Sequence, residues 1–261
     1  MLPPESFTHQ IDVPQVVFIL FALFFAGLVY HLRQEDKREG YPLESDRTAM
    51  SGGQVKVVGF PPLPKPKAFL RKFGDTIYAP GPRLEREVAA VPAHRFPGAP
   101  LIPTGDPLVD GVGPASYALK EEEPDRTWSG EPKLRPLRLA REFHIEHTEP
   151  PVIGMSVETR DGVTVGIVRD VWVETPEYFS RYMEVEATDA LGGWPILLPF
   201  AFADIRTRKR KVIAESVSAR QFARVPALAD RDQITKREED RINAYYAGGY
   251  LYKDEPERKP A

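Results

Sequence analysis

The chain of 261 residues contains no cysteine, and it has no lysine or arginine before Arg33. The missing cysteines exclude disulfides, thiolate metal sites, iron–sulfur clusters and cysteine nucleophiles. A net charge of -3 gives no overall basic character, so nucleic acid is disfavoured as a partner. The sequence also lacks the common motifs of nucleotide-binding proteins, metalloproteases and esterases, which argues against an enzyme of those classes.

Charge is also missing from one long apolar run, VPQVVFILFALFFAGLVYHL, at residues 13–32. About 20 helical residues at 1.5 Å each span the roughly 30 Å hydrocarbon core of a bilayer. A secretory signal peptide is the alternative, but a basic n-region and a small-residue cleavage site are missing. We therefore predict a transmembrane helix over residues 11–33, with Asp12 as its N-cap and Pro14 in its first turn.

Basic residues flank this helix on one side only. Arg33, Lys37 and Arg38 follow it and none precedes it. Because loops rich in lysine and arginine stay in the cytoplasm, we expect residues 1–10 outside and the large C-terminal part inside.

Small residues lie together within the predicted helix. Ala22 and Ala26 form a small-xxx-small pair, and Gly27 stands beside it. Such a strip lets a neighbouring helix approach closely in lipid, so we predict a helix-packing face there. The alternative is that these residues only satisfy the demand for hydrophobicity.

Proline is abundant, at 27 residues, and most of it falls between Pro42 and Pro151. The fixed φ of proline suits an extended backbone path. Apolar residues recur from Phe60 to Leu70, which indicates that the segment packs against another surface. We predict that residues 34–133 form an extended surface segment. An exposed linker or a ligand for a proline-recognition domain are the alternatives.

Short strands with turn signals follow from about Gly154. VTVGIVRDVWVE has apolar odd positions from Val163 to Val173, Arg169 excepted, and RDG at 160–162 predicts a hairpin turn. RYMEVEAT, WPILLPF, FADIRT and KVIAESV continue the series. The pattern predicts a small, antiparallel, partly closed barrel of about six strands.

Two helices are expected after the strands. SARQFARV predicts a short helix, and ITKREEDRINAYYAG predicts a longer amphipathic one that ends at Gly248. The fold class is therefore a single N-terminal transmembrane helix followed by a mainly-β domain at 134–252 with a C-terminal helix. Residues 253–261 are expected to form a flexible tail.

Two groups of side chains are candidates for chemistry. HIEH places His144 and His147 close to acids and fits part of a zinc site, but a third ligand is not visible and a surface histidine pair fits equally. Glu174 and Glu177 end a hydrophobic strand beside aromatic residues, where burial would favour the protonated acid and proton exchange.

Several longer motifs occur in order over almost the whole chain: RQEDKREGYPLE, PLPKPKAF, PTGDPLVDGVGPASY, DVWVETPE, RYMEVE, LLPF and EEDRINAYYAGG. With them the chain resembles the H subunit of the photosynthetic reaction centre of purple bacteria. The resemblance implies a cytoplasmic barrel of the PRC type that caps two membrane subunits, L and M. It also implies an intracytoplasmic bacterial membrane, with the N-terminus periplasmic.

The resemblance further implies a non-catalytic role. The complex is expected to hold bacteriochlorophyll, bacteriopheophytin, quinones and non-haem iron, none of them bound principally by this chain. The H subunit would shield the quinone region and conduct protons to the secondary quinone. Membrane lipids, a cytochrome subunit and light-harvesting antenna are further candidate partners.

Site residues carry over by motif. Glu177 matches a family glutamate of the proton route, Glu174 stands where relatives often have aspartate, and Glu239 matches a buried acid nearby. Ser129 and Glu131 replace a histidine pair that serves some relatives in proton uptake and divalent-metal binding. The point of proton uptake is therefore not assigned.

Two other functional classes remain open at this stage. A membrane-anchored adaptor would use its PRC-type barrel to bind a cytosolic partner, and a membrane-anchored metalloenzyme would use His144 and His147. Near-infrared pigment that co-purifies with the chain would distinguish the reaction-centre subunit from both.

Overall fold

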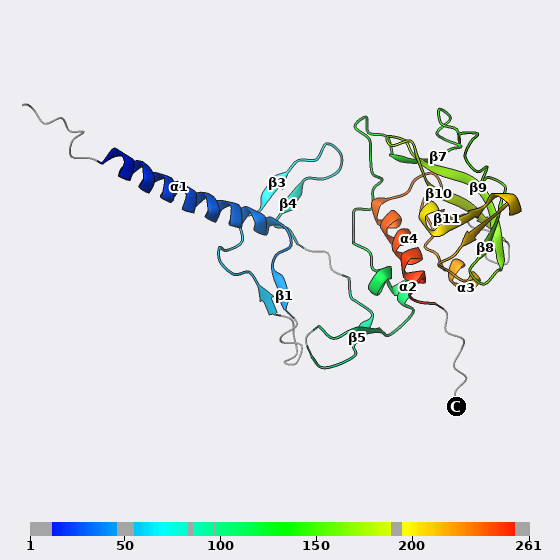
Figure 1. The fold of residues 1–261 in the computed structure, drawn as a ribbon, viewed down its shortest axis with the longest axis horizontal. Helices are drawn as coiled ribbons and strands as arrows, with labels where there is room; N and C mark the ends of the chain where they lie inside the picture. The colour runs from blue at the N-terminus through cyan, green and yellow to red at the C-terminus, as the bar shows by residue number, and fades with distance from the viewer. Residues whose placement is uncertain (1–11, 46–54, 83–85, 97, 189–194, 254–261) are drawn as a thin grey trace, which may run out of the picture. The chain divides into compact units, whose positions relative to one another are not determined.

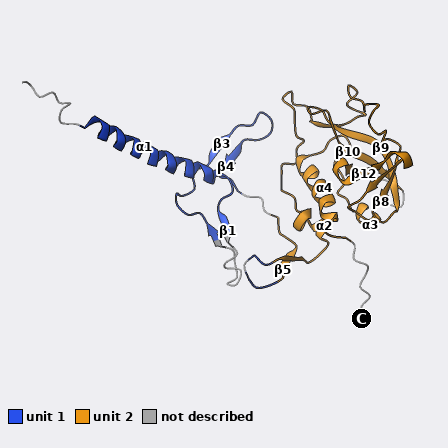
Figure 2. Cartoon of the chain, in the orientation of Figure 1, with its two compact units in different colours: residues 1–83, 94–99 blue, residues 84–93, 100–261 orange. Residues whose placement is uncertain are grey.

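The computed structural model describes residues 12–45, 55–82, 86–96, 98–188 and 195–253 (Figure 1). The chain forms two units (Figure 2), made of residues 1–83 with 94–99 and of residues 84–93 with 100–261. The predictions for residues 1–10 and for 254–261 of the tail lie outside the described residues.

The first unit begins with α1 (Val13–Glu35), which continues into the short 3-10 helix η2 (Asp36–Arg38). The Asp12 carboxylate accepts a hydrogen bond from the Gln15 N–H at 3.3 Å, which confirms the predicted cap. The helix is apolar enough to cross a membrane, with a mean hydropathy of 2.3, and none of its side chains is buried. Because an apolar surface of this size is unfavourable in water, it requires lipid or partner helices around it.

Lys37 fastens the end of this helix to the proline-rich segment. The Lys37 side chain is buried, and its Nζ donates to the carbonyls of Val58 at 2.7 Å and Pro61 at 2.5 Å. The ammonium also lies 5.3 Å from the centre of the Tyr41 ring. The buried charge is thus stabilised by carbonyl dipoles and an aromatic face instead of a carboxylate.

Arg38 makes a second link at the same place. Its guanidinium pairs with Glu35 at 2.7 Å and donates to the carbonyls of Lys65 at 2.9 Å and Ala79 at 2.8 Å. We name Lys37 and Arg38 the carbonyl clamp. Through it, two side chains at the end of α1 fix backbone that lies 21 to 41 residues further along the chain.

The proline-rich segment contains little regular structure. It forms three antiparallel two-stranded hairpins, which are β1 (Leu43–Ser45) with β2 (Val55–Val57), β3 (Lys67–Phe69) with β4 (Ile77–Ala79), and β5 (Ala90–Pro92) with β6 (Leu101–Pro103). Two single turns follow, the helix α2 (Pro107–Asp110) and the 3-10 helix η4 (Gly113–Ala115). The limits of this segment at residues 34 and 133 stay a prediction.

A seven-stranded sheet forms the body of the second unit. Its strands are β7 (Leu134–Pro136), β8 (Ser156–Thr159), β9 (Thr164–Glu174), β10 (Phe179–Ala187), β11 (Pro195–Pro199), β12 (Ala203–Arg206) and β13 (Lys211–Ala214). The order is β11-β10-β9-β8-β13-β12, and β7 pairs with β9 beyond the end of β8. The turn predicted at 160–162 joins β8 to β9.

The predicted mainly-β domain with a barrel that is only partly closed is confirmed, with one difference in strand direction. One pair, β8 with β13, is parallel and not antiparallel. Within the described residues the end strands β11 and β12 are not paired with each other, so the barrel is not closed. The parallel pair arises because the chain crosses over through β9 to β12 before β13 returns beside β8.

Strand β9 departs from the alternation predicted for residues 163–173. Ile167 is exposed, while Val168 and Trp172 are fully buried. The register against β10 shifts between Asp170 and Val168, which leaves Arg169 as the extra residue of a β-bulge. Because a bulge changes the face relation between the residues before and after it, one alternation could not hold across Arg169. The prediction was correct for Val171 and Val173 and wrong for Ile167.

Two helices pack against the sheet, as predicted. The short α3 (Ala219–Phe222) and the longer α4 (Lys236–Gly249) both begin with a capping box, at Ser218 and Thr235. At the end of α4, a Cβ added to Gly248 would lie 2.6 Å from the Cβ of Ala115. Glycine there allows the helix to approach η4 closely.

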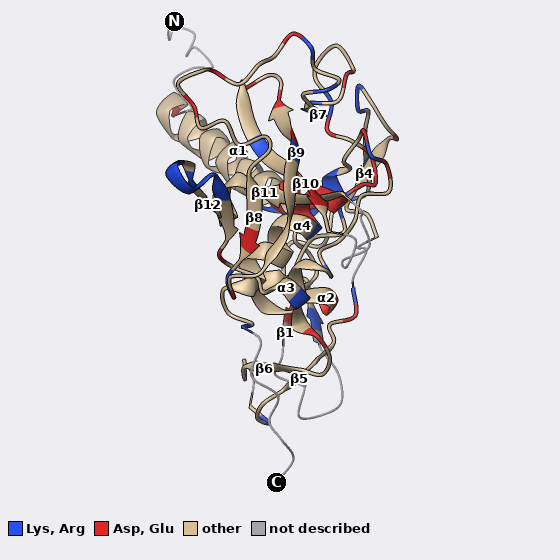
Figure 3. Ribbon diagram, turned by 90° about the vertical axis from the view of Figure 1, so that its right-hand side faces the viewer, with Lys and Arg blue, Asp and Glu red and all other residues tan. Residues whose placement is uncertain are grey.

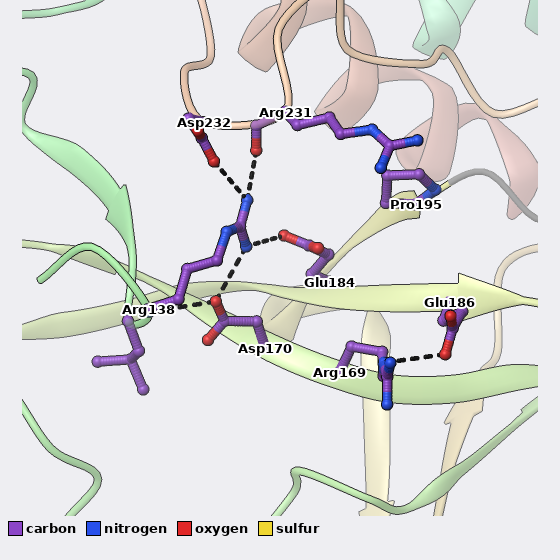
Figure 4. Close-up of a pocket in the computed structure, with 9 residues that line it drawn as sticks. Arg138, Arg169, Asp170, Glu184, Glu186, Pro195, Arg231 and Asp232 are labelled. Carbon is purple, nitrogen blue, oxygen red and sulfur yellow. Dashed lines mark hydrogen bonds and ion pairs between the residues drawn. The ribbon is translucent and has the colours of Figure 1, made fainter.

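Arg138 joins three segments of the second unit (Figure 4). Its guanidinium pairs with Asp170 of β9 at 3.0 Å, with Glu184 of β10 at 2.7 Å and with Asp232 at 3.0 Å, and it donates to the carbonyl of Arg231. These groups line a pocket of about 700 Å³. Arg138 therefore connects β9 and β10 to the segment that precedes α4.

Replacing Arg138 with methionine is expected to reduce the free energy of unfolding by about 2–4 kcal/mol, since Asp170 and Glu184 would keep largely buried charges without their cation. Denaturant unfolding of the full chain in detergent measures it. The matched control is Arg169→Met, whose exposed pair with Glu186 should cost below about 1 kcal/mol. Equal losses in the two variants would contradict the role given to Arg138.

Candidate functional site

A small pocket lies where β7, β9 and β10 meet the start of α4. Its volume is about 60 Å³, which leaves room for water, and it is lined by Pro124, Asp125, Lys133, Leu134, Glu174, Arg181, Ile234 and Glu239. Five of these eight residues are charged and three are apolar, and all of them belong to the second unit. We call it the Glu174–Glu239 pocket.

The backbone brings the two carboxylates together. Glu174 is the last residue of β9, opposite Phe179 of β10 on one side and Leu134 of β7 on the other. Glu239 belongs to the first turn of α4, which the capping box of Thr235 and Glu238 fixes. Both positions are set by regular structure, so neither depends on a loose loop.

Arg181 lies between the two acids. Its Nε is 3.1 Å from Glu174 Oε2, and its Nη2 is 3.4 Å from Glu239 Oε1. The side chain of Glu174 is 15% exposed and that of Glu239 is 26% exposed. A single cation therefore serves two largely shielded carboxylates.

Glu239 is the acid whose protonation the site disturbs. Burial raises the pKa of Glu239, and the negative charge of Glu174 raises it further, whereas Arg181 and Lys120 lower it. A carboxyl with a raised pKa holds its proton closer to neutral pH and is able to exchange it there.

A buried tyrosine adjoins Glu239. The Tyr182 hydroxyl accepts a hydrogen bond from the Asn243 side chain at 2.8 Å. Burial raises the pKa of Tyr182, and the nearby charge of Glu239 adds to the effect. Tyr182 therefore stays neutral, and its proton is available for hydrogen bonding to the acid.

A second ion pair also lines the pocket. Lys133 Nζ lies 2.7 Å from Asp125 Oδ2. The hydrogen bond to Asp125 raises the pKa of Lys133, and the charges of Glu174 and Glu177 contribute to it. Lys133 is thus a fixed cation next to the acids.

The predicted site residues do not all come together. Glu174 and Glu239 line one pocket, whereas Glu177 is exposed in the turn between β9 and β10 and is not among the lining residues. Ser129 and Glu131 are exposed on a neighbouring loop, where the Ser129 hydroxyl bonds to that of Thr127. The roles predicted for Glu174, Glu177 and Glu239 stay predictions.

Sequence reasoning missed Arg181, Tyr182 and Asn243. A signal for Arg181 was present, because a charged residue opened an otherwise alternating strand close in sequence to Glu174. No local signal marked Tyr182 and Asn243, since their contact joins positions 61 residues apart.

The other candidates have less support. His147 is 90% exposed and contacts Glu146, and the described residues contain no cluster of three or more metal-ligating side chains. Ala22, Ala26 and Gly27 lie on α1, where a Cβ added to Gly27 would meet no described atom within 4 Å. The helix-packing face stays a prediction.

Two family models match the chain. The photosynthetic reaction centre H-chain N-terminal region matches residues 5–139, and the PRC-barrel domain matches residues 150–221. The first match covers α1 and the proline-rich segment, and the second covers β8 to α3.

Replacing Glu239 with glutamine is expected to raise the free energy of unfolding above about pH 5, by less than about 1 kcal/mol because water screens part of the side chain. The pKa of Glu239 is raised in the folded state, so ionisation of this carboxyl at higher pH reduces the free energy of unfolding. Glutamine stays neutral and therefore avoids this loss. Denaturant unfolding of the full chain from about pH 4 to about pH 8 measures this. Glu186→Gln is the exposed control, and a pH-independent effect of Glu239→Gln would contradict the assignment.

Proposed function

The chain belongs to the family of photosynthetic reaction centre H chains, and from that membership we propose that it caps the cytoplasmic face of the L and M membrane subunits. In this role it stabilises the complex, shields the quinone sites from water and conducts protons to the secondary quinone. The family match over α1 and the proline-rich segment is the observation that carries the proposal.

The exposed apolar surface of the first unit supports a role in assembly. Every described side chain of α1 from Val13 to Leu32 is exposed, and so are Phe60 and Leu70 in the segment that follows. Ala22 and Ala26 offer a strip where another helix can approach closely. The partner subunits would cover these surfaces.

The Glu174–Glu239 pocket supports the proton role. A doubly reduced quinone takes up two protons in a site closed to bulk water, so exchangeable groups must bridge the distance. The exposed Glu177 would take protons from water, and Glu174 and Glu239 would hold them next to a space of water size. The raised pKa of Glu239 suits it to that exchange.

The proposal includes the cofactors of the complex and the orientation of the chain in the membrane. Bacteriochlorophyll, bacteriopheophytin, quinones and non-haem iron would be held chiefly by the other subunits, and this chain would catalyse no reaction itself. The absence of basic residues before Arg33 supports a periplasmic N-terminus and a cytoplasmic second unit in a bacterial inner membrane.

Assembly is tested by the double variant Ala22→Leu with Ala26→Leu. Added bulk should separate the helices, and we expect at least about a tenfold loss of near-infrared absorbance that co-purifies with the chain in mild detergent. The control is Leu20→Ala with Leu23→Ala, which removes bulk and keeps the small strip. Unchanged pigment recovery would show that Ala22 and Ala26 face lipid, and colourless preparations of the unaltered chain would favour the adaptor.

Proton delivery is tested by Glu174→Gln combined with Glu177→Gln. Glutamine has a similar shape but exchanges no proton, so the second, proton-coupled electron transfer to the secondary quinone should slow by about 10- to 100-fold. Primary charge separation should be unaffected. Flash-induced proton uptake and second-electron kinetics measure the two steps, and small weak acids that carry protons should restore the rate.

The matched control is Glu146→Gln with Glu186→Gln, two exposed acids that do not line the pocket. It removes the same charge and should leave both steps unchanged. Unaltered rates in the Glu174 and Glu177 double variant from about pH 6 to about pH 9 would remove these residues from the route.

A further inference from the structure

The turn between β12 and β13 concentrates positive charge. It reads RTRKRK from Arg206 to Lys211, so every residue except Thr207 is basic. The 3-10 helix η7 (Thr207–Lys209) forms most of it, and Arg206 faces Lys211 across the hairpin. We name this segment the basic hairpin, and Figure 3 shows its positive charge beside β12.

The two ends of the basic hairpin are neutralised and its centre is not. Arg206 pairs with Asp204, and Lys211 pairs with Glu158. The three central side chains are exposed, and within the described part of the chain they have no ion-pair partner: Arg208, Lys209 and Arg210. A surface that served only folding would not need this uncompensated charge.

Arg210 also occupies a backbone position that disfavours it. Its φ is +47° in the left-handed region, where glycine or asparagine is more stable. The chain therefore keeps a cation where a neutral residue would stabilise the turn. Such an outlier points to a function for the charge.

The backbone that Arg210 approaches follows an exposed apolar residue. A Cβ added to Gly154 would be 4.0 Å from Arg210 Nη2, and the preceding Ile153 is 44% exposed. Cations beside an apolar side chain suit the boundary between lipid headgroups and acyl chains.

We propose that the basic hairpin binds anionic phospholipid headgroups at the surface of the bilayer that α1 crosses. The charges are complementary, and the apolar helix holds the whole chain at that bilayer, so the headgroups are present at high local concentration. Three free cations near an anionic surface correspond to about a hundredfold preference for the bound state. This contact would give the second unit its own attachment to the membrane and does not depend on the proton role.

The absence of cysteine makes a direct test practicable. Thr207→Cys introduces a unique thiol at the exposed centre of the hairpin, which is labelled with a fluorophore. The full chain is reconstituted without partner subunits in nanodiscs of phosphatidylcholine alone or with about one third phosphatidylglycerol. A quencher attached to a lipid headgroup then reports whether the label lies at the bilayer surface.

The proposal requires strong quenching in the anionic nanodiscs, little in the neutral ones, and loss of quenching at about 0.5 M salt. Changing Arg208, Lys209 and Arg210 to glutamine should lower the ratio of bound to free hairpin about a hundredfold. A control that changes Arg141, Arg220 and Lys253 to glutamine removes the same charge from other exposed positions and should keep the quenching.

Arg210→Gly is a separate control for folding. It removes the strain of the left-handed backbone conformation together with one cation. It should weaken quenching about fivefold without lowering the melting temperature. Equal quenching in neutral and anionic nanodiscs would overturn the proposal. So would a label that the headgroup quencher does not reach in the anionic nanodiscs, since the hairpin would then not lie at the bilayer surface.

Discussion

The backbone hydrogen bonds on both edges of the buried strand β9 constrain the arrangement of the second unit. Strand β9 pairs with β10 along one edge, and with β8 and then β7 along the other. Since unpaired backbone groups are costly inside a protein, every neighbour of β9 is constrained in register. The bulge at Arg169 allows a single strand to serve these partners in turn, and Glu174 stands where the last of them ends.

The two arginine clusters of the unit differ in how their acids are stabilised. Around Arg138, neutral donors also serve the carboxylates, because the Val171 N–H bonds to Asp170 at 2.8 Å and the Trp172 indole bonds to Glu184 at 2.9 Å. Around Arg181, the hydrogen bond to Glu239 is long, at 3.4 Å. The acids of the first cluster therefore have several hydrogen-bond donors, whereas the second cluster leaves Glu239 with a raised pKa. Similar residues thus form a densely hydrogen-bonded cluster in one place and leave a partly buried acid with a raised pKa in the other.

Patterns in the sequence were sufficient for the helices and most strands, because composition and capping residues specify them locally. The apolar run with Asp12 and the capped start of α4 are examples. The parallel pairing of β8 with β13 and the bulge at Arg169 were not predictable, since both depend on which distant strands meet. For the same reason Glu174 and Glu239 were identified separately, and the pairing of Arg181 with both acids was not predicted. Contacts across many residues are decided by packing, which periodicity does not report.

The carbonyl clamp has a consequence for the order of events during synthesis. Lys37 and Arg38 leave the ribosome directly behind the apolar helix, whereas their acceptors, from Val58 to Ala79, follow 21 to 41 residues later. Until those residues have been made, the two cations lack the carbonyl acceptors that they have in the folded chain. Once the later residues have been made, the same ammonium and guanidinium hydrogen-bond to the carbonyls of the loop. The hydrogen bonds at the end of the helix therefore form only after at least 21 further residues have been synthesised.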